Sequence, residues 1–125
     1  MNFDNNIPIY IQLVEQIKKD IISGKLNPGE KLLSVREFAL QMKVNPNTVQ
    51  KAFVELEELK LIYTERTNGK FVTTNKNLIN KYKKDYANEL SKKYLSSMKD
   101  IGFDKKDTIE YLKEWEEINN EFVRM

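Results

Sequence analysis

The sequence predicts a mostly α fold with one small β-hairpin, in which an N-terminal unit is followed by a two-helix extension. Apolar residues recur at three- and four-residue steps through most of the chain, which is the period of a helix with one buried face. Residues 61–74 instead carry β-branched and aromatic side chains on both sides of Asn68-Gly69. Composition shifts near residues 74–77, so we expect domains at residues 1–75 and 76–125.

Composition excludes several classes of protein. The chain has no cysteine and no histidine, so disulfides, thiolate metal sites and catalysis by a Ser/His or Cys/His pair are impossible. We expect no cofactor and no metal. No basic N-terminal region precedes an apolar run and no apolar run is long enough to span a membrane, which predicts a soluble cytoplasmic protein without a membrane partner. Net charge is only +2, so any DNA partner must be argued from the placement of charges.

The first helix is expected from Pro8 to Ser23, and Gly24 supplies a C-terminal stop. Its apolar positions have helical spacing: Tyr10, Leu13, Val14, Ile17 and Ile21. A Pro-Gly turn follows, after which residues 31–32 could hold a very short strand.

Two helix starts then fall close together. Ser34 followed by Glu37 is a capping box, which predicts a short helix over Val35–Met42. Asn45 is a good N-cap and proline suits the next position, so a longer helix begins there. Its apolar stripe is formed by Val49, Ala52, Phe53, Leu56 and Leu59. A turn of about three or four residues between two such helices is the spacing of a helix-turn-helix.

A hairpin is expected directly after this helix. Asn68-Gly69 is the dipeptide most favoured in a two-residue turn, in which both positions take positive φ. Arg66 and Lys70 place positive charge at the hairpin tip, where a narrow loop can enter a minor groove or follow a phosphate backbone. A helix-turn-helix with such a hairpin is a winged helix.

The second helix of a helix-turn-helix can lie in the DNA major groove with its first residues on base edges. The outward residues near its start can all donate hydrogen bonds to bases or phosphates. They are Asn47, Thr48, Gln50 and Lys51, whereas acidic residues appear only toward the distal end. An ordinary solvated helix face would have similar residue types, and that alternative stays open at this point.

Residues 8–73 resemble the DNA-binding domain of the GntR family of bacterial transcription regulators. The resemblance is carried, in order, by "PIYIQLVEQIKKDIISGKLNPGEKL", "SVREFA", "VNPNTVQKAFVELE" and "LIYTERTNGKFV". It implies a sequence-specific regulator of double-stranded operator DNA. The residues then expected at DNA are Ser34, Arg36, Asn47, Thr48, Gln50, Lys51, Arg66, Asn68, Gly69 and Lys70. For Arg36, an ion pair with the neighbouring Glu37 is the alternative.

The chain departs from the family pattern at three positions. Leu33 replaces a common proline, Pro46 replaces a frequent basic residue, and Lys60 stands where a glycine usually ends the second helix. Pro46 and Gln50 remove two guanidinium contacts, so binding is expected to rely more on the remaining basic residues. Lys60 leaves the helix end without its usual positive-φ residue.

Two more helices are expected after residue 75. One begins near Lys76 and is broken by Gly102. The other is capped by Asp104 and is amphipathic, and its apolar residues are Ile109, Leu112, Trp115 and either Ile118 or Phe122. This tail is too short for a large effector domain, and with "IGFDKKDTIEYLKEW" it resembles the small YtrA-type subfamily. That resemblance implies a homodimer and a repressor of an operon, often one that encodes an ABC transporter.

Exposed apolar surface on the tail favours the same role. The two helices would expose more apolar surface than a monomer normally tolerates, and a symmetric partner would bury it. The residues expected at the dimer interface are Tyr82, Tyr86, Tyr94, Leu112 and Trp115, with a ligand pocket between the tail helices as the alternative. Whether an unknown small-molecule effector binds the protein stays open. The alternative function is a winged-helix protein-interaction module. An enzyme is not expected, because the sequence shows no pairing of an acidic residue with a nucleophile.

Overall fold

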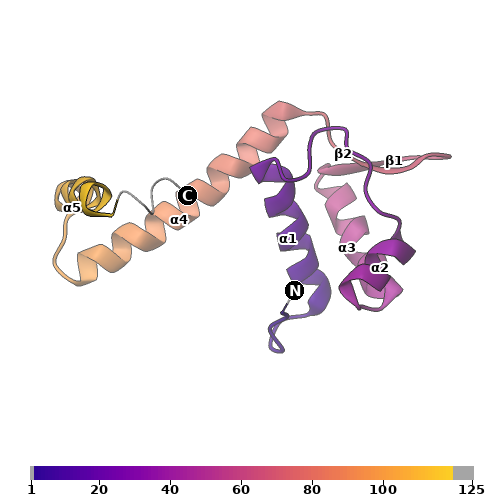
Figure 1. Cartoon of the computed structure of the whole chain (residues 1–125), viewed down its shortest axis with the longest axis horizontal. Helices are drawn as coiled ribbons and strands as arrows, with labels where there is room; N and C mark the ends of the chain where they lie inside the picture. Colours follow the sequence, from indigo (N-terminus) through magenta and orange to yellow (C-terminus); the bar gives the residue numbers. More distant parts are fainter. Residues whose placement is uncertain (1, 120–125) are drawn as a thin grey trace. The chain divides into compact units, whose positions relative to one another are not determined.

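The computed structural model describes residues 2–119, within which three helices, one two-stranded antiparallel sheet and two further helices follow one another in the order that the sequence predicts (Figure 1). Contacts divide the chain after Lys83 into two compact units. This division falls inside a helix and does not establish where an independent domain ends, so the boundary expected at residue 75 stays a prediction. Within these residues, no helix is both long and apolar enough to cross a membrane.

The N-terminal unit is built around one recurrent apolar face on each of its helices. Its elements are α1 (Ile9–Ser23), α2 (Val35–Met42), α3 (Pro46–Glu58), β1 (Ile62–Glu65) and β2 (Gly69–Val72). Both α1 and α2 pack on α3, and the hairpin follows α3 directly (Figure 1). The fully buried side chains come from α1, α3 and the hairpin segment: Leu13, Ile21, Val49, Phe53, Leu56, Leu61 and Val72. Burying each large one stabilises the unit by about 1.5–3 kcal/mol.

Side-chain caps fix the two helix starts where the sequence predicts them. Ser34 Oγ accepts from the Glu37 N–H at 3.1 Å, and Glu37 Oε1 accepts from the Ser34 N–H at 3.1 Å. Asn45 Oδ1 accepts from the Asn47 N–H at 2.8 Å. The turn between α2 and α3 is residues 43–45, and Lys43 makes it with a left-handed φ of 57°. The predicted helix-turn-helix is therefore confirmed.

The end of α3 is well defined although the usual glycine is missing. Lys60 itself takes a left-handed φ of 62°. Its N–H donates to the Glu57 carbonyl at 2.9 Å, and the Leu61 N–H donates to the Leu56 carbonyl at 3.0 Å. This pair of bonds is a Schellman stop, which a non-glycine residue adopts at a conformational cost.

The hairpin is present, but the predicted turn is wrong in detail. The strands pair from Ile62↔Val72 to Glu65↔Gly69, so residues 66–68 connect them. The Asn68 N–H donates to the Glu65 carbonyl at 3.1 Å, and Asn68 is not a positive-φ residue. Of residues 62–72, only Gly69 takes positive φ, 109°, because the three-residue connection bends one position earlier than a two-residue Asn-Gly turn would.

A third segment completes the wing. Lys31 forms an isolated antiparallel bridge with Phe71, and the Leu32 N–H donates to the Lys70 carbonyl at 2.8 Å. The Val72 N–H donates in turn to the Glu30 carbonyl at 2.9 Å. The very short strand expected at residues 31–32 is therefore present only as an isolated bridge at Lys31.

The last two helices are α4 (Lys76–Asp100) and α5 (Lys105–Ile118) (Figure 1). The start of α4 packs with the N-terminal unit, where Ile79 joins the buried core. In the C-terminal unit, Gly102 follows α4 with φ 96°, and Asp104 caps α5, accepting from the Asp107 N–H at 2.8 Å. The predicted break and cap are confirmed, whereas Phe122 lies outside the described residues.

Candidate nucleic-acid interface

The start of α3 presents one polar, open face. Asn47, Gln50 and Lys51 are exposed at i, i+3 and i+4 on this face. The opposite face is completely buried, with Val49, Ala52, Phe53 and Leu56 in the core. Thr48 lies at the edge between the two faces and is half-buried. The first turn contains no acidic residue, so the positive end of the helix dipole is not neutralised.

Val54 continues this face one turn further on and was missed by the sequence analysis. Its side chain is 45% exposed, although apolar residues elsewhere on α3 are buried. An exposed β-branched side chain on a groove-reading helix can contact the methyl group of thymine. Its position, i+4 from Gln50, is the signal that sequence reasoning could have used.

Lys51 leans toward α1 instead of extending freely from α3. Its Nζ lies 4.0 Å from the centroid of the Tyr10 ring, which is a close cation–π contact. Tyr10 is half-buried against the core, so it provides a fixed platform. The contact limits the directions in which Lys51 can reach, although the residue as a whole is exposed.

Arg36 and Ser34 have different roles at the start of α2. Arg36 is exposed and forms no ion pair with any of residues 2–119, so the alternative pairing with Glu37 is not observed. The Ser34 N–H, then the Ser34 hydroxyl, lowers the pKa of Glu37, which is committed to the cap. Ser34 contributes its hydroxyl to that cap as well, while Arg36 remains available for a phosphate.

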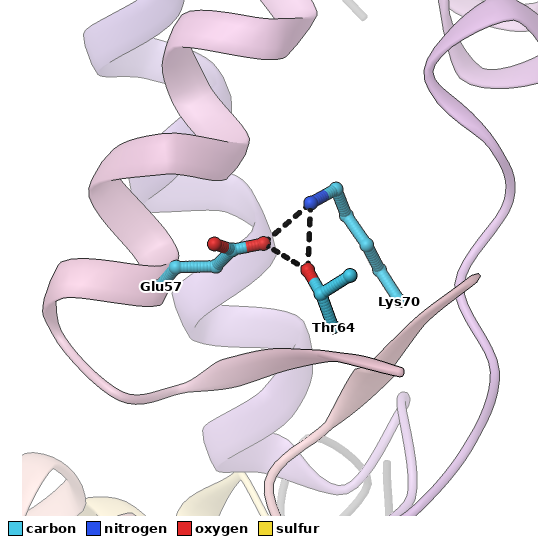
Figure 2. A network of polar contacts seen from close by, with 3 residues as sticks. All are labelled: Glu57, Thr64 and Lys70. Carbon is cyan, nitrogen blue, oxygen red and sulfur yellow. Dashed lines mark hydrogen bonds and ion pairs between the residues drawn. The ribbon is translucent and has the colours of Figure 1, made fainter. Parts of the chain in front are cut away.

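The middle of the wing is held by a polar network that the sequence did not predict. Lys70 Nζ forms an ion pair with Glu57 of α3 and donates to Thr64 Oγ1 at 2.9 Å (Figure 2). Thr64 Oγ1 donates to Glu57 Oε1 at 2.5 Å. The hydrogen bond from Lys70, followed by that from Thr64, lowers the pKa of Glu57 below its ordinary value of 4.5. The positive charge of Lys70 is therefore balanced by the carboxylate of Glu57 in a partly exposed ion pair.

The wing tip brings together Arg66, Asn68 and Gly69. Arg66 is exposed and forms no ion pair within residues 2–119. The Asn68 side-chain amide donates to Glu65 Oε2 at 3.0 Å, so it stabilises the turn. Lys31, which sequence analysis did not assign to the interface, also reaches this tip: its Cε lies 3.3 Å from the position that a Cβ on Gly69 would occupy.

The tail residues expected at a dimer interface occupy two different environments. Tyr82 belongs to the N-terminal unit, where its hydroxyl donates to the Leu59 carbonyl at 3.3 Å and Lys18 Nζ lies 5.3 Å from its ring centroid. In the C-terminal unit, Tyr94 is 40% and Leu112 is 44% exposed. Tyr86 and Trp115 are half-buried. The interface itself stays a prediction.

The fold and this face together define a class of protein. A helix-turn-helix whose second helix opens with exposed donors and no acidic residue, followed by a hairpin wing, is the architecture of a winged-helix transcription regulator. Among residues 2–119, no group of acidic, histidine or cysteine side chains is suited to hold a metal ion. The model of the family described as "Bacterial regulatory proteins, gntR family" matches residues 9–72, and the chain belongs to this family.

Relatives extend the match over nearly the whole chain. The HTH-type transcriptional regulator YhcF of Bacillus subtilis (strain 168) is 36% identical over 115 residues, which cover 92% of this chain and 95% of YhcF. The HTH-type transcriptional repressor YtrA of the same organism is 44% identical over 71 residues, or 57% of this chain and 55% of YtrA. Regulators of this kind are not enzymes, so the sequence-based exclusion of an enzyme is confirmed.

Solved structures agree with these relatives. A GntR family transcriptional regulator from Listeria monocytogenes has a TM-score of 0.80 at 42% identity, covering 90% of this chain and 98% of that one. The DNA-binding domain of AraR in complex with operator ORR3 has a TM-score of 0.52 at 30% identity, covering 58% of this chain and 88% of that one. The predicted winged-helix fold is confirmed.

Proposed function

We propose that this regulator is a homodimeric repressor that reads operator DNA with the start of α3, the start of α2 and the wing. The observation that carries the proposal is the open face of α3, where Asn47, Gln50 and Lys51 are exposed donors and no acid lies in the first turn. A helix face that is only solvated has no reason to lack acidic residues in its first turn, because acidic side chains are favourable at a helix N-terminus. A DNA-reading helix does need it.

Each exposed residue has a role that its chemistry suits. Asn47 and Gln50 contact base edges, since their amides match the N6/N7 edge of adenine. Thr48, half-buried at the edge of the face, and Arg36 on α2 contact phosphates. At the tip, Arg66 enters the minor groove or follows its backbone, and the bare backbone of Gly69 permits close approach.

Two features support the homodimer and the repressor. The C-terminal unit exposes several large apolar side chains that a second copy would cover: Leu90, Tyr94, Ile101, Ile109, Tyr111, Leu112 and Ile118. The relative YtrA is named a transcriptional repressor. The short tail resembles that of the YtrA-type subfamily, and an operon for an ABC transporter is then the proposed target. A repressor bound to the operator acts in the cytoplasm.

A mobility-shift titration on the DNA upstream of the protein's own gene tests the proposal. The purified protein is titrated at two salt concentrations, with and without non-specific competitor DNA. We expect a competitor-resistant shift that weakens steeply with salt, because basic side chains displace counterions from phosphates. A shift that competitor abolishes would contradict operator recognition, and no shift at either salt concentration would favour the protein-interaction alternative.

A further inference from the structure

Lys31 is placed beside the wing tip by backbone pairing. Lys31 forms an antiparallel bridge with Phe71 of β2. The residues on either side of it are hydrogen-bonded to the same strand: the Leu32 N–H donates to the Lys70 carbonyl at 2.8 Å, and the Glu30 carbonyl accepts from the Val72 N–H at 2.9 Å. The backbone of Lys31 is therefore held as part of the wing. Its side chain is exposed.

The side chain of Lys31 passes over Gly69. A Cβ placed on that glycine would lie 3.3 Å from Lys31 Cε and 4.0 Å from Lys31 Nζ. Because glycine has no Cβ, the aliphatic stem of Lys31 lies close to the wing backbone and its ammonium ends beside the tip. The same glycine that permits the turn thus makes room for a cation.

Lys31 and Lys70 lie on opposite faces of the wing. Side chains alternate along a strand, and directly paired residues share a face. Lys31, paired with Phe71, shares its face with Gly69 and Tyr63. Lys70, paired with Thr64, lies on the face that carries the buried Val72 and meets Glu57 of α3 (Figure 2).

The two lysines also differ in charge balance. The ammonium of Lys70 is neutralised by Glu57, and binding a phosphate with it would leave that carboxylate unpaired near a negative DNA backbone. Lys31 has no ion pair within residues 2–119, and its charge acts on Glu37 only at longer range. Of the two wing lysines, Lys31 is the one whose charge is available to DNA.

We propose that Lys31, and not Lys70, is the lysine of the wing that binds a phosphate of the DNA backbone. This inference rests on the proposed function and assigns it a binding residue. Neutralising one phosphate of B-DNA contributes about 0.9 to the slope of log affinity against log salt. Lys31 should therefore account for about that much of the slope for each bound protomer.

The test is the salt dependence of binding by Lys31→Met and Lys70→Met, measured by fluorescence anisotropy. A random-sequence duplex is one probe, because phosphate contacts do not depend on sequence, and the upstream DNA is the other. Methionine keeps an unbranched stem over Gly69 and removes the charge. We expect K31M to lower the slope by about 0.9 per protomer and K70M to leave it unchanged. K31R should keep the wild-type slope, and thermal unfolding followed by circular dichroism verifies that each variant is folded.

Three outcomes would overturn the inference. They are an unchanged slope for K31M, a K70M slope that falls as much as that of K31M, and a K31R slope as shallow as that of K31M. If the wild-type protein binds the random duplex and shows no preference for the upstream DNA, the proposed operator recognition is wrong. The slopes of K31M and K70M on the random duplex would still decide whether Lys31 binds a phosphate. Absence of wild-type binding to both duplexes would defeat both proposals.

Discussion

At the scale of single residues, the interface depends on which side chains are already committed to the fold. Ser34 and Asn68 bond within the protein, and Lys70 is paired with Glu57. Arg36 and Arg66 form no ion pair within residues 2–119. Residue type together with the family resemblance predicted all five at DNA, whereas the contacts distinguish side chains that shape the surface from side chains that can bind.

Arg36→Ala should weaken operator binding while leaving the fold intact. Arg36 is exposed and forms no ion pair within residues 2–119, so its loss should remove only the contact to DNA. We expect affinity to fall roughly tenfold in a mobility-shift titration. Gln41→Ala, which truncates another exposed residue of α2, is the control and should bind like wild type. Unchanged affinity of R36A would remove Arg36 from the site.

Lys60→Gly should stabilise the protein by about 1 kcal/mol. Lys60 holds a left-handed φ of 62°, where a residue with a Cβ is strained and glycine is not. The free energy of unfolding is measured in urea. Lys60→Ala is the matched control, since alanine also has a Cβ and should bring no such gain. Equal stability of K60G and K60A would show that the Schellman stop carries no strain.

Glu57→Gln tests the network at the base of the wing through its pH dependence. The bonds from Lys70 and Thr64 lower the pKa of Glu57 in the folded state. Such a depressed pKa contributes stability above the unfolded value of 4.5, and this contribution is lost as pH falls through the folded-state pKa. Because the pair is partly exposed, we expect E57Q to cost at most about 1 kcal/mol at neutral pH.

The difference in stability between wild type and E57Q should then shrink in acid. Unfolding in urea at neutral pH and at pH values below 4.5 measures it. Glu58→Gln removes a charge one residue away without touching the network, so it should not reproduce the pattern. A difference for E57Q that stays constant with pH would argue against the ion pair as the source of stability.

At the scale of elements, most of the fold follows from local chemistry. The boundaries of α2 and α3 were predictable because a capping box, an Asn cap and an N1 proline satisfy backbone donors within a few residues. The hairpin turn was predicted wrongly in detail, because strand register and not the Asn-Gly dipeptide sets where it bends. The network of Glu57 and the position of Lys31 depend on contacts between distant segments, which periodicity and capping do not encode.

Ser34→Ala tests the capping box as a structural device. It removes the acceptor of the Glu37 N–H and leaves a backbone donor at the start of α2 without its partner. We expect a loss of about 1 kcal/mol in the free energy of unfolding. Ser34→Asp, which can accept the same bond, should restore most of it. If S34A unfolds like wild type, the cap does not stabilise α2.

At the scale of the whole molecule, the proposed homodimer depends on the C-terminal unit. Leu112 is an exposed apolar residue of α5, so Leu112→Glu should leave the protomer folded and prevent association. Glu110→Lys lies on nearly the opposite side of the same helix and is the control. Sedimentation velocity should show a monomer for L112E and a dimer for E110K. A dimer for both would place the interface elsewhere.

The central claim is that two copies of this chain read one operator through α3 and the wing. Hydroxyl-radical footprinting on the upstream DNA tests it most directly. We predict two protected half-sites that form an inverted repeat, with centres about one helical turn or a multiple of it apart. Protection of a single unsymmetrical site, or of no defined site at concentrations that shift the DNA, would contradict the account.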